Sequence, residues 1–236
     1  MIKNTKQAIC IALDVDNADT AYWLVDRLKD HVGYFKVGMQ LFYHYGPALI
    51  DKLIEKEIRI FLDLKFHDIP NTVKNAAISA LRMNVNMFNV HASGGHSMMQ
   101  QAVEGAKEIS QKNNIPMPKI LGVTILTSLT QNMVSQELNW PGSLKERVCN
   151  LARLSQQAGL DGVVASPREI EWIRNVCGDD FMIVTPGIRP VWAMTQDQKR
   201  VMTPSQAMDS GADMIVVGRP VIQAEDPVLA VNRLFD

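Results

Sequence analysis

The sequence predicts a single (β/α)8 barrel that takes up all of residues 1–236. Eight short β-branched segments recur along the chain, and segments with helical spacing lie between them. The strand segments are almost wholly apolar rather than alternating, which is typical of parallel strands covered on both faces. A length of 236 residues also suits one barrel, since such domains take about 200–250 residues.

The predicted strands follow one another at intervals that leave room for a helix after each. In chain order they are residues 8–14, 34–38, 58–66, 86–92, 119–126, 161–166, 181–187 and 213–218. The clearest helical patterns cover 71–83 and 143–159, and the second ends at Gly159, as helices commonly do. An open doubly wound sheet is the alternative. That fold usually carries a glycine-rich turn after its first strand, where this chain has Leu-Asp-Val-Asp-Asn at 13–17.

Composition excludes several classes of protein. With 24 Lys and Arg against 25 Asp and Glu, the net charge of −1 leaves no overall basic surface for nucleic acid. The 3 cysteines are far apart and form no Cys-x-x-Cys motif. This indicates a reducing compartment and argues against a structural zinc site. No run approaches the roughly 18 apolar residues of a membrane helix. We therefore expect a cytoplasmic protein with neither a membrane nor a nucleic-acid partner.

Polar residues gather where the predicted strands end. In a barrel the ligand lies against the C-terminal ends of the strands, so residues there are candidates for a site. At or just after those ends stand Asp14, Lys36, Asp63, Lys65, Asp68, His91, Thr127, Ser166, Arg189 and Arg219. The charges are densest after the third strand.

The segment Phe-Leu-Asp-Leu-Lys-Phe-His-Asp-Ile-Pro-Asn-Thr (61–72) carries the strongest catalytic signal. Asp63 and Lys65 are two residues apart on a strand, so we expect their side chains to share one face. Asp68 follows the strand. An Asp-Lys-Asp array would hold the lysine as an ammonium ion, since nearby opposite charges favour the charged form. The pattern alone fits a catalytic array or a structural ion pair equally well.

Two further segments indicate an anion site. Residues 185–190 (Thr-Pro-Gly-Ile-Arg-Pro) and 216–220 (Val-Val-Gly-Arg-Pro) each place a glycine and an arginine where a strand gives way to a helix. Backbone N–H groups and guanidinium groups bind phosphate there in many barrels. The alternative is that Arg189 and Arg219 only cap or bridge the rim. Residues 189–204, polar and without helical periodicity, form a candidate lid.

Six ordered motifs together resemble one family. They are Ala-Leu-Asp-Val-Asp-Asn (12–17), Phe-Lys-Val-Gly (35–38), the stretch 63–72, Val-Thr-Ile-Leu-Thr-Ser (123–128), 185–190 and 216–220. Their order and spacing resemble the orotidine 5′-monophosphate decarboxylase family, in its shorter bacterial-type branch, over essentially the whole chain. This resemblance implies a (β/α)8 barrel that acts as a homodimer. It also implies conversion of orotidylate to uridylate and CO2 without a metal or an organic cofactor.

The resemblance also implies residue roles. Lys65 would be the ammonium ion that stabilises charge at C6 of the pyrimidine and then protonates it, with Asp63 beside it and near the departing carboxylate. Lys36 would hold Asp63 and the ribose region, and Asp14 would bind ribose hydroxyls. The remaining implied contacts are Asp68 and Thr72 from the neighbouring subunit, Thr127 and Ser128 at the base or ribose, Arg189, Gly218 and Arg219 at the phosphate, and Gln198 between phosphate and base.

Two departures from the family pattern concern the surroundings of the site. Met39 stands where related sequences usually have a charged residue, and residues 191–198 lack the glycines often found in the lid. Two alternatives remain at this stage. One is a magnesium-dependent sugar-phosphate decarboxylase or aldolase of the same superfamily, and the other is a non-catalytic barrel that binds phosphosugars.

Overall fold

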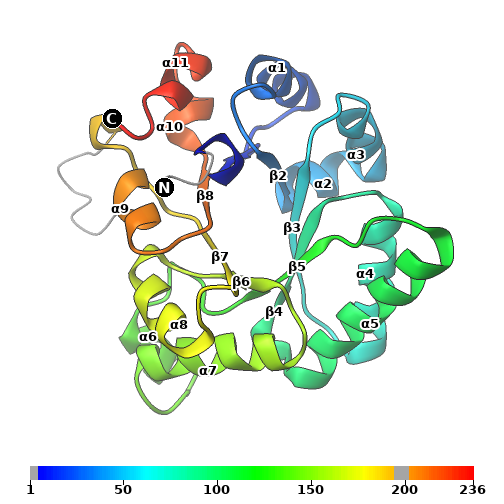
Figure 1. The fold of residues 1–236 in the computed structure, drawn as a ribbon, viewed down its shortest axis with the longest axis vertical. Coiled ribbons are helices and arrows are strands. Elements are labelled where there is room, and N and C mark those ends of the chain that lie inside the picture. Colours follow the sequence, from blue (N-terminus) through cyan, green and yellow to red (C-terminus); the bar gives the residue numbers. More distant parts are fainter. Residues whose placement is uncertain (1–4, 194–201) are drawn as a thin grey trace.

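Eight parallel strands close into one barrel in sequence order (Figure 1). The structure is a computed structural model that describes residues 5–193 and 202–236. The strands are β1 (Ile9–Ala12), β2 (Tyr34–Gly38), β3 (Ile60–Phe66), β4 (Met87–His91), β5 (Lys119–Val123), β6 (Gly162–Val164), β7 (Met182–Thr185) and β8 (Met214–Val217). Pairing of β8 with β1, with Ile11 opposite Val217, closes the barrel. The predicted fold class is confirmed, and the open doubly wound sheet is excluded.

Helices form a ring around the strands (Figure 1). They are α1 (Ala18–Leu28), α2 (Met39–Tyr45), α3 (Pro47–Ile54), α4 (Pro70–Arg82), α5 (His96–Asn113), α6 (Gln131–Gln136), α7 (Leu144–Gln157), α8 (Ile170–Cys177), α9 (Pro204–Asp209), α10 (Arg219–Ile222) and α11 (Pro227–Asn232). Short 3-10 turns are η1 (Thr5–Ala8), η2 (Ala92–Gly94), η3 (Pro167–Glu169) and η4 (Val191–Ala193). Every strand is therefore followed by helix, as the sequence predicts.

The two helices with the clearest sequence patterns begin and end where local chemistry allows. The helix predicted over 71–83 is α4, which starts one residue earlier because proline suits the first helical position. The helix predicted over 143–159 is α7, and Ser143 caps it through a reciprocal pair of bonds with Glu146. Ala158 rather than Gly159 is the C-cap, and Gly159 follows in the left-handed region at φ +86°.

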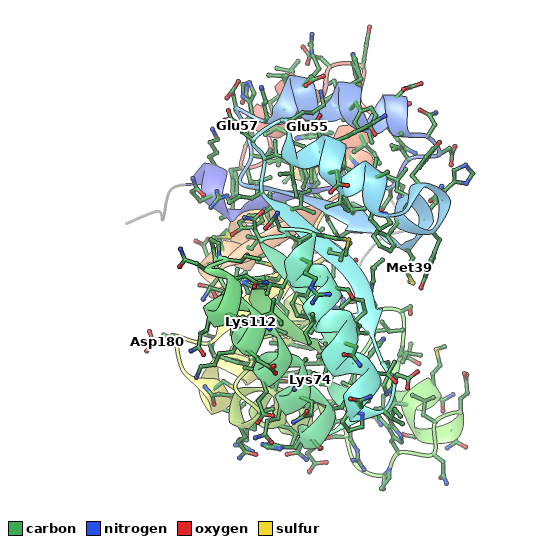
Figure 2. The ribbon with its side chains drawn as sticks, turned by 90° about the vertical axis from the view of Figure 1, so that its right-hand side faces the viewer. Met39, Glu55, Glu57, Lys74, Lys112 and Asp180 are labelled. Atoms are coloured by element: carbon green, nitrogen blue, oxygen red, sulfur yellow. The ribbon has the colours of Figure 1, made fainter. Side chains whose placement is uncertain are left out.

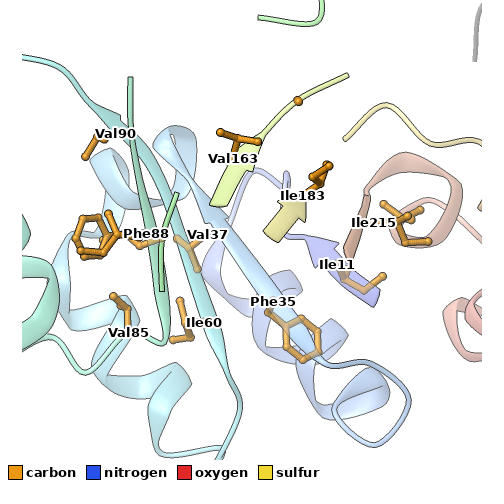
Figure 3. Close-up of a cluster of buried hydrophobic side chains, with 14 of the residues drawn as sticks. Ile11, Phe35, Val37, Ile60, Val85, Phe88, Val90, Val163, Ile183 and Ile215 are labelled. Atoms are coloured by element: carbon orange, nitrogen blue, oxygen red, sulfur yellow. The ribbon is translucent and has the colours of Figure 1, made fainter. Parts of the chain in front are cut away.

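Each strand buries both of its faces, which explains the nearly continuous apolar runs. One set of side chains fills the barrel interior: Cys10, Ala12, Phe61, Met87, Leu121, Val184, Met214 and Val216. The alternate set packs outward under the helices, as Figure 3 shows for Ile11, Phe35, Ile60, Phe88 and Ile215. The polar residues at the C-terminal ends of the strands thus lie above a closed apolar interior, so ligand chemistry is confined to that end of the barrel.

Every predicted strand is present, but pairing stops before several of the apolar runs do. The run at 119–126, for example, is paired only to Val123, and its last residues, Leu126 among them, belong to the loop at the rim. The three cysteines are free thiols. No helix within residues 5–193 and 202–236 is long and apolar enough to cross a membrane.

Candidate active site

Four charged side chains of alternating sign lie in series across the C-terminal ends of β1, β2 and β3. Lys36 Nζ lies 3.0 Å from Asp14 Oδ1 and 3.3 Å from Asp63 Oδ2. Lys65 Nζ lies 2.7 Å from Asp63 Oδ1. We call these four residues the charged array. Asp14 is its exposed end, with 56% of the side chain accessible, whereas Asp63 at 13% and Lys36 at 11% are largely buried.

The two buried members of the array, Asp63 and Lys36, are kept ionised by the charges around them. Burial alone would neutralise Asp63, but Lys36 and Lys65, with hydrogen bonds from Lys65 and Asn89, outweigh it and lower the pKa of this carboxyl. Burial likewise disfavours the Lys36 ammonium, yet Asp63 and Asp14 outweigh that effect and raise its pKa. At neutral pH Asp63 and Lys36 therefore carry fixed opposite charges despite their burial.

The contact between Asp63 and Lys65 is as predicted, but the regular strand geometry assumed for it is wrong. Phe61 and Leu62 pair with Met87 and Phe88, and pairing resumes only with Phe66 opposite Val90. Three residues of β3 thus oppose the single Asn89 of β4, a bulge in which Lys65 adopts a φ of +53°. The bulge aims the lysine side chain back at Asp63.

Asn89 is a residue of the site that sequence reasoning missed. Its Nδ2 donates to Asp63 Oδ1 at 2.7 Å, and its Oδ1 accepts the Lys65 backbone N–H at 2.8 Å. Only 1% of Asn89 is exposed. A lone amide in the otherwise apolar stretch Met-Phe-Asn-Val (87–90) was the available signal, since a buried polar side chain needs partners.

Asp68 is not part of the charged array formed by the described residues of its own chain, and its entry into the neighbouring subunit's site stays a prediction. Among residues 5–193 and 202–236 it joins no ion pair, and its Oδ1 accepts the Ile69 backbone N–H at 2.6 Å. Asp68 and Thr72 are both exposed. Lys36 on β2 and Asp14 just after β1 continue the series from Asp63 instead.

The two predicted phosphate segments come together on the neighbouring part of the rim. Burial and the nearby charge of Arg219 lower the pKa of Arg189, so the two guanidinium groups repel each other. Gly218 joins this part of the rim to the array, because a Cβ there would lie 3.8 Å from Asp14 Oδ2. Two cations of this kind at a strand end are typical of an anion site.

The other predicted residues lie around the same rim or beyond the described chain. Thr127 and Ser128 are exposed in the loop after β5. Gln198 lies outside the described residues. The two ends of the predicted lid are tied together, because Ile188 bridges to Met202 and the Arg189 N–H donates to the Met202 carbonyl at 3.1 Å.

Two imidazoles border the array. His91, which ends β4, and His67, just after β3, lie with ring centroids 5.2 Å apart. Burial, His67 and Lys65 all lower the pKa of His91, so its ring is neutral at pH 7. The rim beside Lys65 is thus polar without a further fixed charge from this ring.

Comparison with known proteins identifies the family. Residues 7–234 match the model described as "Orotidine 5'-phosphate decarboxylase / HUMPS family". The chain belongs to this family. It is 49% identical over 231 residues to a protein of Heliobacterium modesticaldum named orotidine 5′-phosphate decarboxylase, a match that covers 98% of this chain and 95% of that protein.

Further members of the orotidine 5′-phosphate decarboxylase / HUMPS family agree in sequence and in fold. A protein of Syntrophotalea carbinolica with the same name is 48% identical over 236 residues, covering 100% of this chain and 96% of that one. The crystal structure of orotidine 5′-phosphate decarboxylase from Lactobacillus acidophilus superposes with a TM-score of 0.84 at 38% identity, covering 96% of each chain. The resemblance seen in the six sequence motifs is confirmed.

Proposed function

We propose that this chain converts orotidine 5′-monophosphate to uridine 5′-monophosphate and CO2, with Lys65 as the acid that protonates the product. The observation that carries the proposal is the Lys65 ammonium, held 2.7 Å from the buried Asp63 at the ligand-facing rim. Near-full-length similarity to proteins named orotidine 5′-phosphate decarboxylase supports the same reaction. We take residues 1–236 as one barrel domain.

The chemistry explains why a fixed cation is needed. When the bond between C6 and the carboxylate breaks, the electron pair stays on C6 in the plane of the pyrimidine ring, where the π system of the ring cannot delocalise it. A preorganised positive charge stabilises such a centre best, because it need not reorient during the reaction. Lys65 supplies that charge and then gives C6 a proton. Asp63 holds Lys65 in place, and Lys36 holds Asp63.

Substrate binding uses the remaining parts of the rim. Arg189, Arg219 and Gly218 bind the phosphate dianion, which relieves the repulsion between the two guanidinium groups. Gln198 links phosphate and base. Asp14 and Lys36 bind ribose hydroxyls, and Thr127 and Ser128 meet the base or ribose. Binding energy from the phosphate, remote from C6, then helps to organise the array.

The active unit in this proposal is a homodimer in which Asp68 and Thr72 enter the neighbouring site. Asp68 is exposed and stands apart from the ion pairs of its own barrel. Large apolar side chains are exposed after three strand ends on this side of the barrel, namely Met39 at 44%, Ile69 at 66% and Leu126 at 41%. Exposed apolar side chains at one end of a barrel suit a subunit interface. Location in the cytoplasm stays a prediction.

One assay tests the function. Loss of orotidylate absorbance is followed in the presence of excess EDTA, and the expected result is full turnover. Dependence on added Mg2+, with action on a pentulose or hexulose phosphate instead, would favour the sugar-phosphate decarboxylases and aldolases. Nucleotide binding without turnover would favour a non-catalytic barrel.

A further inference from the structure

We propose that Asn89 is a positioning residue that fixes Asp63 and Lys65 together through the two ends of its side-chain amide. This inference rests on the proposed decarboxylase function and adds a residue to it. Asn89 lies on β4, whereas Asp63 and Lys65 lie on β3. The pair that carries the chemistry is therefore held from the neighbouring strand.

The bulge in β3 creates the need for such a residue. Between Leu62 and Phe66 the regular ladder with β4 is interrupted, and Lys65 adopts a φ of +53°, which costs free energy for a residue with a side chain. Leaving the Lys65 backbone N–H without a hydrogen-bond partner in this buried region would add a further cost in free energy. Asn89 Oδ1 accepts the Lys65 N–H at 2.8 Å and so replaces the missing bond of the ladder.

The other end of the amide acts on the charge. Asn89 Nδ2 donates to Asp63 Oδ1 at 2.7 Å, the same oxygen that lies 2.7 Å from Lys65 Nζ. A hydrogen bond to the charged form keeps a carboxyl ionised, and Asn89 is among the groups that lower the pKa of Asp63. One neutral side chain thus fixes the backbone of the lysine and the orientation of its counter-ion.

An amide suits this position better than any other side chain of its size. Leucine has nearly the same shape but forms neither bond. An ionised aspartate accepts the Lys65 N–H but places a second negative charge against Asp63. A protonated aspartic acid can do both, since its O–H donates and its carbonyl accepts. These differences allow the two contacts to be tested by substitution.

The first experiment compares Asn89→Leu with Asn86→Leu by steady-state kinetics and binding of uridylate. Asn86 is a matched control, because its Oδ1 accepts the Ile60 backbone N–H at 2.8 Å between the same two strands, at the end away from the site. We expect Asn89→Leu to lower kcat about 100-fold, as misplacement of a catalytic group by about 1 Å can do, while uridylate affinity changes little. An equal loss of kcat in Asn86→Leu would overturn the proposal, because the effect would then be a general weakening of the sheet.

The second experiment uses Asn89→Asp and measures kcat from pH 5 to pH 9 relative to the wild-type chain. The introduced carboxyl faces Asp63 and Lys65 from β3 and Lys36 from β2, with His91 and His67 near the strand ends. Asp63 stays ionised because it lies between two lysines. A proton taken up by the two facing carboxyl groups is therefore carried by the carboxyl introduced at position 89. We expect the ratio of kcat to rise as pH falls, since protonation restores both bonds. A ratio independent of pH would overturn the proposal.

The pKa of Asp63 itself, measured by NMR of the carboxyl carbon, separates this inference from the proposed function. We expect a higher Asp63 pKa in Asn89→Leu than in the wild-type chain or in Asn86→Leu, and an unchanged value would overturn the role of Asn89. This readout needs no turnover. If the wild-type chain fails to decarboxylate orotidylate, the proposed function is overturned. The comparison of Asp63 pKa values still decides whether Asn89 positions Asp63. Thermal unfolding of each variant establishes that it is folded.

Discussion

At the scale of single residues, the array depends on mutual compensation of buried charges. Removing one member of a buried ion pair leaves the other charge uncompensated, which is costly even where the pair itself adds little stability. Asp63 is the least replaceable member, because it contacts Lys36, Lys65 and Asn89. Lys65 sits at the end of the series, and in the proposed mechanism it is the member that acts on the substrate.

We predict that Lys65→Ala lowers kcat at least about 100-fold while uridylate binding stays measurable, because the lost charge acts mainly in the transition state. Lys74→Ala is the control. Lys74 pairs with Glu108 Oε2 at 3.1 Å on the helical layer, away from the rim (Figure 2). Steady-state kinetics measures kcat, and calorimetry measures the affinity of each variant for uridylate. A Lys65→Ala enzyme with more than about 1% of the wild-type kcat would contradict the role of this lysine.

Glu169 gives a second prediction at this scale, on stability. It is 5% exposed in the turn after β6, and burial raises its pKa to about 7 from the ordinary 4.5. A raised pKa in the folded state means that the stabilising contribution is complete at low pH and is lost between pH 4.5 and 7. Glu169→Gln keeps an acceptor for the Ser166 N–H without the charge. At pH 8 it should raise the free energy of unfolding by about 1–3 kcal/mol, and at pH 4.5 it should change little.

Glu146→Gln is the matched control for that measurement. Glu146 makes the same kind of capping box with Ser143, but hydrogen bonds from Ser143 lower its pKa, so its contribution is present above its ordinary pKa and lost in acid. Denaturant unfolding at both pH values should therefore show Glu146→Gln less stable than the wild type at pH 8. Gains of the same sign in both variants would contradict the burial argument for Glu169.

At the scale of elements, the segments after β7 and β8 lie close together. Arg189 lies in the loop after β7, whereas Arg219 begins α10 after β8, and the loop is closed at its base by the contact of Ile188 with Met202. The base of the predicted lid is thus anchored beside the arginines. In the proposed function, phosphate bound there would connect ligand recognition to the lid.

We predict that Arg219→Ala lowers kcat/KM for orotidylate by about 30- to 900-fold, which corresponds to about 2–4 kcal/mol for a charge-assisted contact. Orotidine without its phosphate should lose almost nothing from the same substitution. Arg27→Ala controls for loss of an arginine elsewhere, since Arg27 pairs at the surface with Asp226 at 3.7 Å. Equal losses with nucleotide and nucleoside would show that Arg219 does not bind the phosphate.

At the scale of the whole molecule, the two ends of the barrel differ in kind. Met39, after β2, lies at one end, and Glu57 and Asp180, before β3 and β7, lie at the other (Figure 2). The end with Met39 carries the charged array, the exposed Asp68 and the exposed apolar side chains. Binding of substrate and pairing of subunits would therefore take place on the same end.

We predict that Lys65→Ala and Asp68→Ala chains complement each other in mixed dimers. If Asp68 enters the neighbouring site, a mixed dimer holds one site with both lesions and one with neither. Random assortment makes about half of the dimers mixed, so refolding an equal mixture should restore about a quarter of wild-type activity. Mixed dimers confirmed by mass, yet no more active than the sum of the two mutants, would show that Asp68 serves its own barrel.

The barrel could be predicted from the sequence, because strands buried on both faces and helices of 3.6-residue period leave clear local patterns. The strand ends that carry charge could be predicted too, since apolar runs lead to Lys36, Asp63, Lys65, Arg189 and Arg219. Cap residues such as Ser143 set where helices begin, through bonds to residues three positions away. All of these are short-range properties of the chain.

The connections between the charges depend instead on how the strands pair. The sequence predicts Lys36 and Asp63 on different strands but does not show that they touch. The registers of β1, β2 and β3 bring Asp14, Lys36 and Asp63 together. The bulge at Lys65 and its support by Asn89 likewise arise from a mismatch between β3 and β4. Periodicity describes each strand alone, whereas register and bulges depend on the pairing of two strands far apart in sequence. For that reason the charged residues at the strand ends could be named from the sequence, but Asn89 and its contacts with Asp63 and Lys65 could not.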